Sequence, residues 1–155
     1  MINIQSKENM GKLEQHIEKW SKSKGANVSL DSFRYEFEQF KEIVGKQKFP
    51  RVLEIGSGSG LFLTYLLVSS HSDQCVGIDP VYEKDGTKKN EVRKTKELLR
   101  KIDIENKIDL RFRTFKDFLK VEEDEKYDLI IFRNSLHHIY PRLEKNSTKR
   151  SRKSV

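Results

Sequence analysis

Three glycines at alternate positions form the part of this sequence best suited to holding a ligand. Gly56, Gly58 and Gly60 follow a short, largely apolar run, 51–55, that is typical of a fully buried strand. Glycine permits positive φ angles and lets the backbone approach a ligand closely. Residues 61–68 are almost wholly apolar and predict a helix. A strand, a glycine turn and a helix place a ligand at the carboxyl end of the strand, against the helix amino terminus.

Two carboxylates accompany this turn. Glu54 lies near the end of the predicted strand, where a buried charge is costly unless it faces a cleft and a partner. Asp79 follows the apolar run 75–78 and lies 19 residues after Gly60, the spacing of a carboxylate that binds ribose hydroxyls. Asp79 also precedes a proline, so a turn residue is the alternative. The spacing favours the ligand role.

An acidic residue, one further residue and then Gly-x-Gly-x-Gly, as Glu54 to Gly60 read, resembles motif I of the class I S-adenosylmethionine (SAM) dependent methyltransferases. A nicotinamide-binding turn more usually reads Gly-x-Gly-x-x-Gly. The resemblance implies SAM as the cofactor, with its methionine ammonium near Glu54 and its ribose held by Asp79. It further implies an apolar side chain against the adenine just after Asp79. The remaining cofactor-binding candidates of this part of the chain are Gly56, Ser57, Gly58, Pro80 and Val81.

Three later residues are further candidates for cofactor binding. Asp117 fits the family's contact to the adenine amino group, with Phe118 next to the ring; an N-cap or surface carboxylate is the alternative. The predicted strand 127–132 runs into Arg-Asn-Ser-Leu-His-His, which is similar to motif IV of the small-molecule branch of the family. Polar residues that end a buried strand face the ligand crevice. Asn134 is therefore expected to line the methionine end of SAM.

Two adjacent histidines are the candidates for acid–base chemistry. His137 or His138 is placed to act as general base on a substrate hydroxyl or amine, because histidine titrates near neutral pH. A helix-start or packing role is the alternative, and it is favoured for each histidine taken singly. Adjacent histidines point to different sides, and no Cys or Asp/Glu cluster completes a metal site. We expect no metal.

Apolar residues at helical spacing predict two amphipathic helices before the first strand. The first is expected to end near Gly25, and the second to begin with Asp31 or Ser32 as N-cap and to stop at Gly45. We expect both helices to pack on the core; a lid over the substrate is the alternative. The two stripes are Met10, Leu13, Ile17 and Trp20, then Leu30, Phe33, Phe37, Phe40 and Val44.

The fold class follows from the alternation of strands and helices. This order predicts a parallel α/β sheet, and the resemblance makes it a Rossmann-like three-layer α/β/α fold after two amphipathic helices. The chain supplies about four strands where the resembled fold has seven, so the domain is expected to be truncated at its carboxyl end. The predicted elements are central strands 51–55, 75–78 and 127–132, an edge strand 108–113, helices 61–68 and 84–102, and a turn or short helix 115–121.

The sequence predicts three regions of different charge. They are a helical cap, 1–48, a SAM-binding domain, 49–140, and a basic, disordered tail, 141–155. The formal net charge of the whole chain is +7, and most of the excess lies in the tail. One cysteine, no secretory signal and no apolar run long enough to span a bilayer indicate a cytoplasmic protein that does not bind membranes.

The resemblance implies methyl transfer from SAM to an oxygen or nitrogen acceptor, with a small molecule favoured. One alternative is a SAM-binding module without turnover, dimerising through the open edge of the sheet. Another is an RNA methyltransferase that uses the basic tail. The identity of the acceptor is not encoded in any pattern we recognise.

Overall fold

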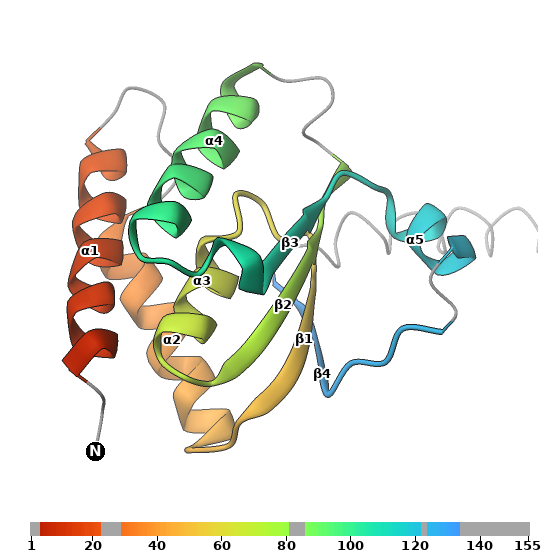
Figure 1. Cartoon of the computed structure of the whole chain (residues 1–155), viewed down its shortest axis with the longest axis horizontal. Coiled ribbons are helices and arrows are strands. Elements are labelled where there is room, and N and C mark those ends of the chain that lie inside the picture. Colours follow the sequence, from red (N-terminus) through yellow and green to blue (C-terminus); the bar gives the residue numbers. More distant parts are fainter. Residues whose placement is uncertain (1–3, 23–28, 81–85, 122–123, 134–155) are drawn as a thin grey trace, which may run out of the picture.

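The computed structural model describes residues 4–22, 29–80, 86–121 and 124–133 of the chain. Helices and strands alternate after two leading helices, as the sequence predicts (Figure 1). The elements are α1 (Ile4–Ser21), α2 (Leu30–Val44), β1 (Phe49–Ile55), α3 (Leu61–Val68), β2 (Ser72–Ile78), α4 (Gly86–Lys101), a short 3₁₀ helix η2 (Glu105–Lys107), β3 (Ile108–Arg111), α5 (Phe115–Val121) and β4 (Leu129–Phe132).

Four parallel strands form one sheet in the order β3-β2-β1-β4. Val52 of β1 lies opposite Cys75 of β2 and Leu129 of β4. The prediction that 108–113 contributes an edge strand is confirmed, since β3 pairs only with β2 among the described strands. The prediction of a central strand at 127–132 is wrong for the described part of the chain, where β4 forms the other edge. Ile130 and Phe132 of β4 are exposed, whereas Leu129 and Ile131 pack against the larger hydrophobic core.

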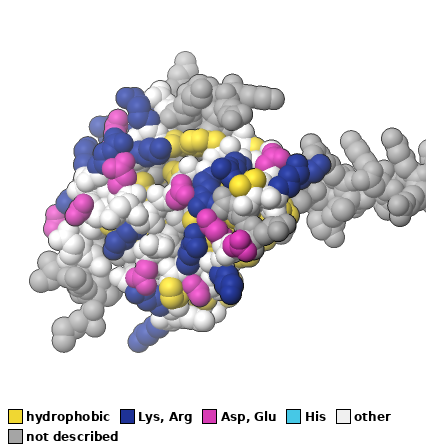
Figure 2. All heavy atoms as spheres, turned by 45° about the vertical axis from the view of Figure 1, so that its right-hand side comes forward, with side chains coloured by type: hydrophobic (Ala, Val, Ile, Leu, Met, Phe, Trp, Pro, Cys, Tyr) yellow, Lys and Arg dark blue, Asp and Glu magenta, His cyan; other side chains and the backbone are white. Residues whose placement is uncertain are grey.

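The sheet has a thick helical layer on one face and a thin one on the other. Helices α1 to α4 lie on one side, and α5 lies on the opposite side (Figure 1). The larger hydrophobic core joins α1, α2, α3 and α4 to one face of the sheet, and a smaller core surrounds Phe118 on the other face. This arrangement confirms the predicted three-layer, Rossmann-like fold. On the face turned forward in Figure 2, acidic and basic side chains are interspersed, with hydrophobic side chains between them.

The two leading helices bury their predicted stripes. Leu13 and Ile17 of α1 and Phe37 of α2 are fully buried, which supports packing on the core. The N-cap of α2 is Ser29, not Asp31 or Ser32, because the Ser29 hydroxyl oxygen accepts a hydrogen bond from the Ser32 backbone N–H at 3.1 Å. Gly45 ends α2 with a φ of 60°, as predicted. Gly25, the predicted end of the first helix, lies outside the described residues, and α1 ends at Ser21.

Two further properties of the described residues concern helix hydrophobicity and the cysteine. None of the helices in the described ranges has both the length and the apolar character needed to cross a lipid bilayer. Cys75 is buried in β2, and burial raises the pKa of its thiol to about 12. The thiol is therefore a packing group rather than a nucleophile at neutral pH.

Truncation of a core leucine tests this packing. Leu66→Ala should lower the free energy of unfolding by about 2–5 kcal/mol, because Leu66 is fully buried in the larger core and its loss leaves a cavity. Leu119→Ala is the matched control, since Leu119 is 55% exposed on α5 and its truncation should change stability by no more than about 0.5 kcal/mol. Urea unfolding of both variants measures the difference, and equal losses would contradict the described core.

Candidate functional site

The turn between β1 and α3 has a backbone conformation that favours glycine. Gly56, Gly58 and Gly60 have φ angles of 78°, 55° and 82°. Gly60 is also the N-cap of α3, and a Cβ atom there would lie 2.9 Å from a methyl carbon of Leu110. The dihedral angle therefore favours glycine at this position, whereas the Leu110 methyl group is the end of a flexible side chain that can shift.

Hydrogen bonds tie this turn to the end of β2. The backbone N–H groups of Gly56 and Ser57 donate to the Ile78 carbonyl oxygen at 2.8 and 3.2 Å. The N–H of Gly58 donates to a carboxylate oxygen of Asp79 at 3.0 Å. The structure thus brings the predicted Asp79 directly against the glycine turn. Its contact with a ribose stays a prediction.

Gly77 of β2 is a supporting residue that the sequence analysis missed. A Cβ atom on Gly77 would lie 2.6 Å from the Ser57 hydroxyl oxygen, so the glycine makes room for that side chain. Ser57 itself is buried and packs against the sheet. A glycine inside a strand indicates a close approach of another group, and this was the available signal.

Glu54 is buried at the carboxyl end of β1 and bonds to Arg133, the residue after β4. Arg133 Nε donates to Glu54 Oε1 at 3.0 Å, and Arg133 Nη1 donates to Glu36 Oε2 of α2 at 2.5 Å. The guanidinium also lies 5.0 Å from the centre of the Phe62 ring. The second carboxylate oxygen of Glu54, Oε2, is buried and has no hydrogen-bond partner among the described residues.

The electrostatics of this group favour a further donor at Glu54. Burial raises the pKa of Glu54 to about 7, although the charge and hydrogen bond of Arg133 act in the opposite direction. Burial alone would lower the pKa of the Arg133 guanidinium. The charges and hydrogen bonds of Glu54 and Glu36 together have the larger effect, so the pKa is raised. With all three groups ionised, two carboxylates face one cation. An ammonium group at Oε2 would balance the charge and satisfy the unpaired oxygen.

Arg133 and Glu36 were not predicted as site residues. Arg133 directly follows an apolar strand, which is a weak signal for a residue at the ligand edge. Glu36 lies on an amphipathic helix and is only partly exposed, but nothing near it in sequence indicates its partner. Their pairing depends on the packing of α2 beside β4.

The residues around α5 are tied into local structure. The backbone N–H of Asp117 donates to the Thr114 hydroxyl oxygen at 3.1 Å, and the hydroxyl in turn donates to the Asp117 carboxylate at 2.5 Å. Thr114 therefore caps α5, and Asp117 is an exposed carboxylate in its first turn, so Asp117 is not the N-cap that one alternative named. The Thr114 hydrogen bond lowers the pKa of Asp117. Phe118 is buried in the smaller core, so the adenine contact of these two residues stays a prediction.

Other predicted residues are exposed or outside the described ranges. Pro80 is exposed at the end of β2. Val81, Asn134, His137 and His138 lie outside the described residues. Within those residues, no group of three His, Cys, Asp or Glu side chains is placed to hold a metal ion.

The raised pKa of Glu54 predicts a specific dependence of stability on pH. Because the folded chain holds this proton more tightly than the unfolded chain, the stabilisation is complete below about pH 4.5 and is lost as pH rises through about 7. Relative to Glu54→Gln, the wild type should lose about 3 kcal/mol of unfolding free energy across this range. Urea unfolding at several pH values measures the difference, with the exposed Glu42→Gln as the control for loss of a carboxylate. A constant difference would contradict the raised pKa.

Several solved structures align with this chain, and an O-methyltransferase is among them. The O-methyltransferase from Bacillus cereus, solved with S-adenosylhomocysteine (SAH), aligns with 79% of this chain and 54% of its own at 16% identity and a TM-score of 0.50. TrmK from M. capricolum, also solved with SAH, aligns with 63% of this chain and 39% of its own at 13% identity and a TM-score of 0.47. YcgJ from Bacillus subtilis aligns with 68% of this chain and 40% of its own at 22% identity and a TM-score of 0.49.

The alignments cover only part of each solved structure. The chain spans between 38% and 59% of the length of eight solved structures that it matches. A search of curated proteins gave no match.

A family model matches most of the sequence. The model is described as a methyltransferase domain, and it matches residues 15–144. The match begins within α1 and includes the glycine turn, Asp79, the whole sheet and the Glu54–Arg133 pair. It covers more than four fifths of the chain. The chain therefore belongs to the methyltransferase-domain family and has the Rossmann-like fold of the class I, SAM-dependent enzymes.

Proposed function

We propose that this chain binds SAM and transfers its methyl group to an oxygen or nitrogen atom of a small-molecule acceptor. The observation that carries the proposal is the buried Glu54 carboxylate, which keeps one oxygen unpaired beside a glycine turn. Membership of the methyltransferase-domain family and the fold shared with the SAH-bound O-methyltransferase from Bacillus cereus support it. SAM supplies an electrophilic methyl group on a sulfonium centre.

The described residues fit the polar groups of SAM. Glu54 would accept from the methionine ammonium, because Glu54, Arg133 and Glu36 together lack one positive charge. A carboxylate has about four lone-pair sites, so Asp79 can accept from Gly58 and from ribose hydroxyls as well. Gly56 and Gly58 have positive φ angles and no Cβ atom, which allows a ligand to approach the backbone of the turn closely. These residues would contribute alignment and electrostatic stabilisation.

The acceptor side of the proposal depends on His137 and His138. In direct displacement, the acceptor oxygen or nitrogen forms a bond to the methyl carbon while the sulfur–carbon bond breaks and sulfur keeps the electron pair. The proton lost by the acceptor would pass to one of these histidines, because imidazole is the side chain whose ordinary pKa is closest to neutrality. The small-molecule preference comes from the motif IV resemblance of residues 133–138.

A second candidate function is SAM binding without turnover. It is favoured by the extent of the alignment, because the chain spans 54% of the Bacillus cereus O-methyltransferase. It is also favoured by β4, which ends the described sheet with Ile130 half exposed. Incubation with SAM and a panel of hydroxyl and amine acceptors separates the two functions, since only the enzyme releases SAH.

Calorimetric titration with SAM tests the cofactor assignment. Asp79→Asn should weaken SAM binding about tenfold or more, because the amide keeps an acceptor for the Gly58 N–H but loses charged hydrogen bonds to the ribose. Asp73→Asn is the matched control, since Asp73 is an exposed carboxylate of the same strand. Its affinity for SAM should equal that of the wild type. A folded wild-type chain that does not bind SAM would contradict the proposed function.

A further inference from the structure

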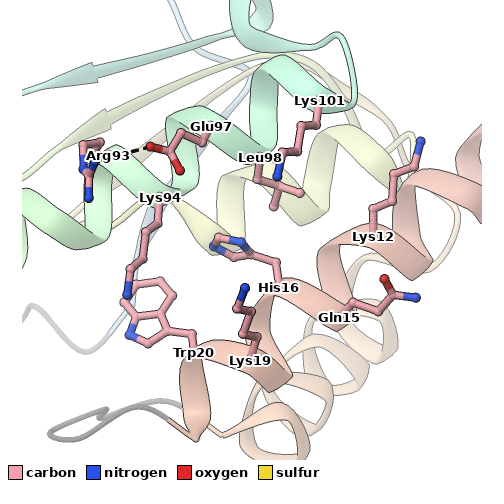
Figure 3. Close-up of a pocket in the computed structure, with 10 residues that line it drawn as sticks. All are labelled: Lys12, Gln15, His16, Lys19, Trp20, Arg93, Lys94, Glu97, Leu98 and Lys101. Atoms are coloured by element: carbon pink, nitrogen blue, oxygen red, sulfur yellow. Dashed lines mark ion pairs between the residues drawn. The ribbon is translucent and has the colours of Figure 1, made fainter.

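A cavity lies between α1 and α4. It has a volume of about 720 Å³, which is within the range of small-molecule sites, and residues from both helices face it (Figure 3). None of the residues that line it belongs to the Glu54 network, the glycine turn or Asp79. The cavity is therefore separate from the proposed SAM site. We call it the α1–α4 groove.

The groove gathers cations with few counter-charges. Five lysine or arginine side chains line it, against the single carboxylate of Glu97. That carboxylate already pairs with Arg93 at 3.6 Å, and Lys12 pairs with Glu8 at 2.6 Å. The other three cations have no ion pair with any residue in the described ranges. They are Lys19, Lys94 and Lys101.

This concentration of positive charge makes the groove attractive to anions. Like charges that converge on one cavity repel one another, most strongly where the surroundings are partly buried. The effect is visible at His16, whose pKa is lowered by burial and then by Lys94 and Lys101, while Glu97 acts in the opposite direction and Lys19 adds a smaller lowering. A bound anion would relieve the repulsion.

His16 and Trp20 add chemistry that a plain lysine surface lacks. The Nε2 atom of His16 is buried and has no hydrogen-bond partner within the described part of the chain. A neutral imidazole can place its proton on that nitrogen and donate to an oxygen acceptor. The ring lies edge-on to Trp20, with centroids 6.1 Å apart. Trp20 and Leu98 give the groove an apolar wall beside its cations.

We propose that the α1–α4 groove binds the phosphate groups of a nucleotide, either free or within a single-stranded nucleic acid. Phosphate oxygens would accept hydrogen bonds from Lys94, Lys101 and the buried nitrogen of His16. More than one unpaired cation fits a ligand with more than one negative charge. The apolar wall at Trp20 fits a base or sugar attached to the phosphate.

The single tryptophan of the chain makes the groove directly observable. Titration of the full chain with ATP, and separately with a short oligouridylate, should give a saturable change in Trp20 fluorescence. The double variant Lys94→Gln, Lys101→Gln should weaken binding about tenfold or more, because charged hydrogen bonds to phosphate are lost. Lys46→Gln, Lys107→Gln is the matched control, since both lysines are exposed and lie outside the groove. Binding by this control should be unchanged.

Two comparisons distinguish the source of the phosphate. Tighter binding of ATP than of oligouridylate would identify a free nucleotide. Tighter binding of oligouridylate, with an affinity that falls more steeply with salt, would identify a nucleic acid. Saturating SAH should leave either titration unchanged, so the result does not depend on the SAM proposal.

A nuclear magnetic resonance titration of His16 provides a readout in the wild-type chain. Bound phosphate should raise the pKa of His16, because its charge offsets that of the neighbouring lysines. The proposal is overturned if ATP and oligouridylate both leave Trp20 fluorescence unchanged and both leave the pKa of His16 unchanged. It is also overturned if a folded double variant binds both ligands as tightly as the wild type does.

Discussion

The buried ion pair between Glu54 and Arg133 determines the structure of the ligand edge. It joins the end of β1 to the end of β4, and Arg133 also donates a hydrogen bond to Glu36 on α2. Removing one partner of a buried pair typically costs about 3–5 kcal/mol, because the other charge is left uncompensated. The three elements are therefore held together at the point where one carboxylate oxygen stays unpaired. The Glu54 carboxylate therefore contributes to stability through one oxygen and is the proposed ligand contact through the other.

The glycine turn imposes a second constraint at the same edge. Its backbone bonds to Ile78 and Asp79, so the position of the turn depends on β2 as well as on β1. Gly77 permits the close approach of Ser57 that this connection requires. The carboxyl ends of two central strands thus present a carboxylate each, Glu54 and Asp79, on either side of one turn. Such a pair suits a ligand with an ammonium at one end and hydroxyls at another.

Local sequence patterns predicted the helices and strands, but they did not predict the contacts between segments that are distant in the sequence. The helix at 61–68 and the stop at Gly45 followed from apolar runs and glycine chemistry. The pairing of Arg133 with Glu36 has no local signal, because 97 residues separate them. The α1–α4 groove likewise has no local signal. In the sequence its lysines indicate only solvent-exposed helix faces, and the fold places two such faces opposite each other.

Proton release on SAM binding tests the central claim most directly. An ammonium beside Glu54 favours its ionised form, so binding should expel the proton that burial retains below about pH 7. Calorimetry at about pH 6.5, in buffers of different ionisation enthalpy, should show release of about half a proton or more in the wild type. Glu54→Gln should release none from this position. Equal release by both chains would contradict the assignment of Glu54 as the ammonium site.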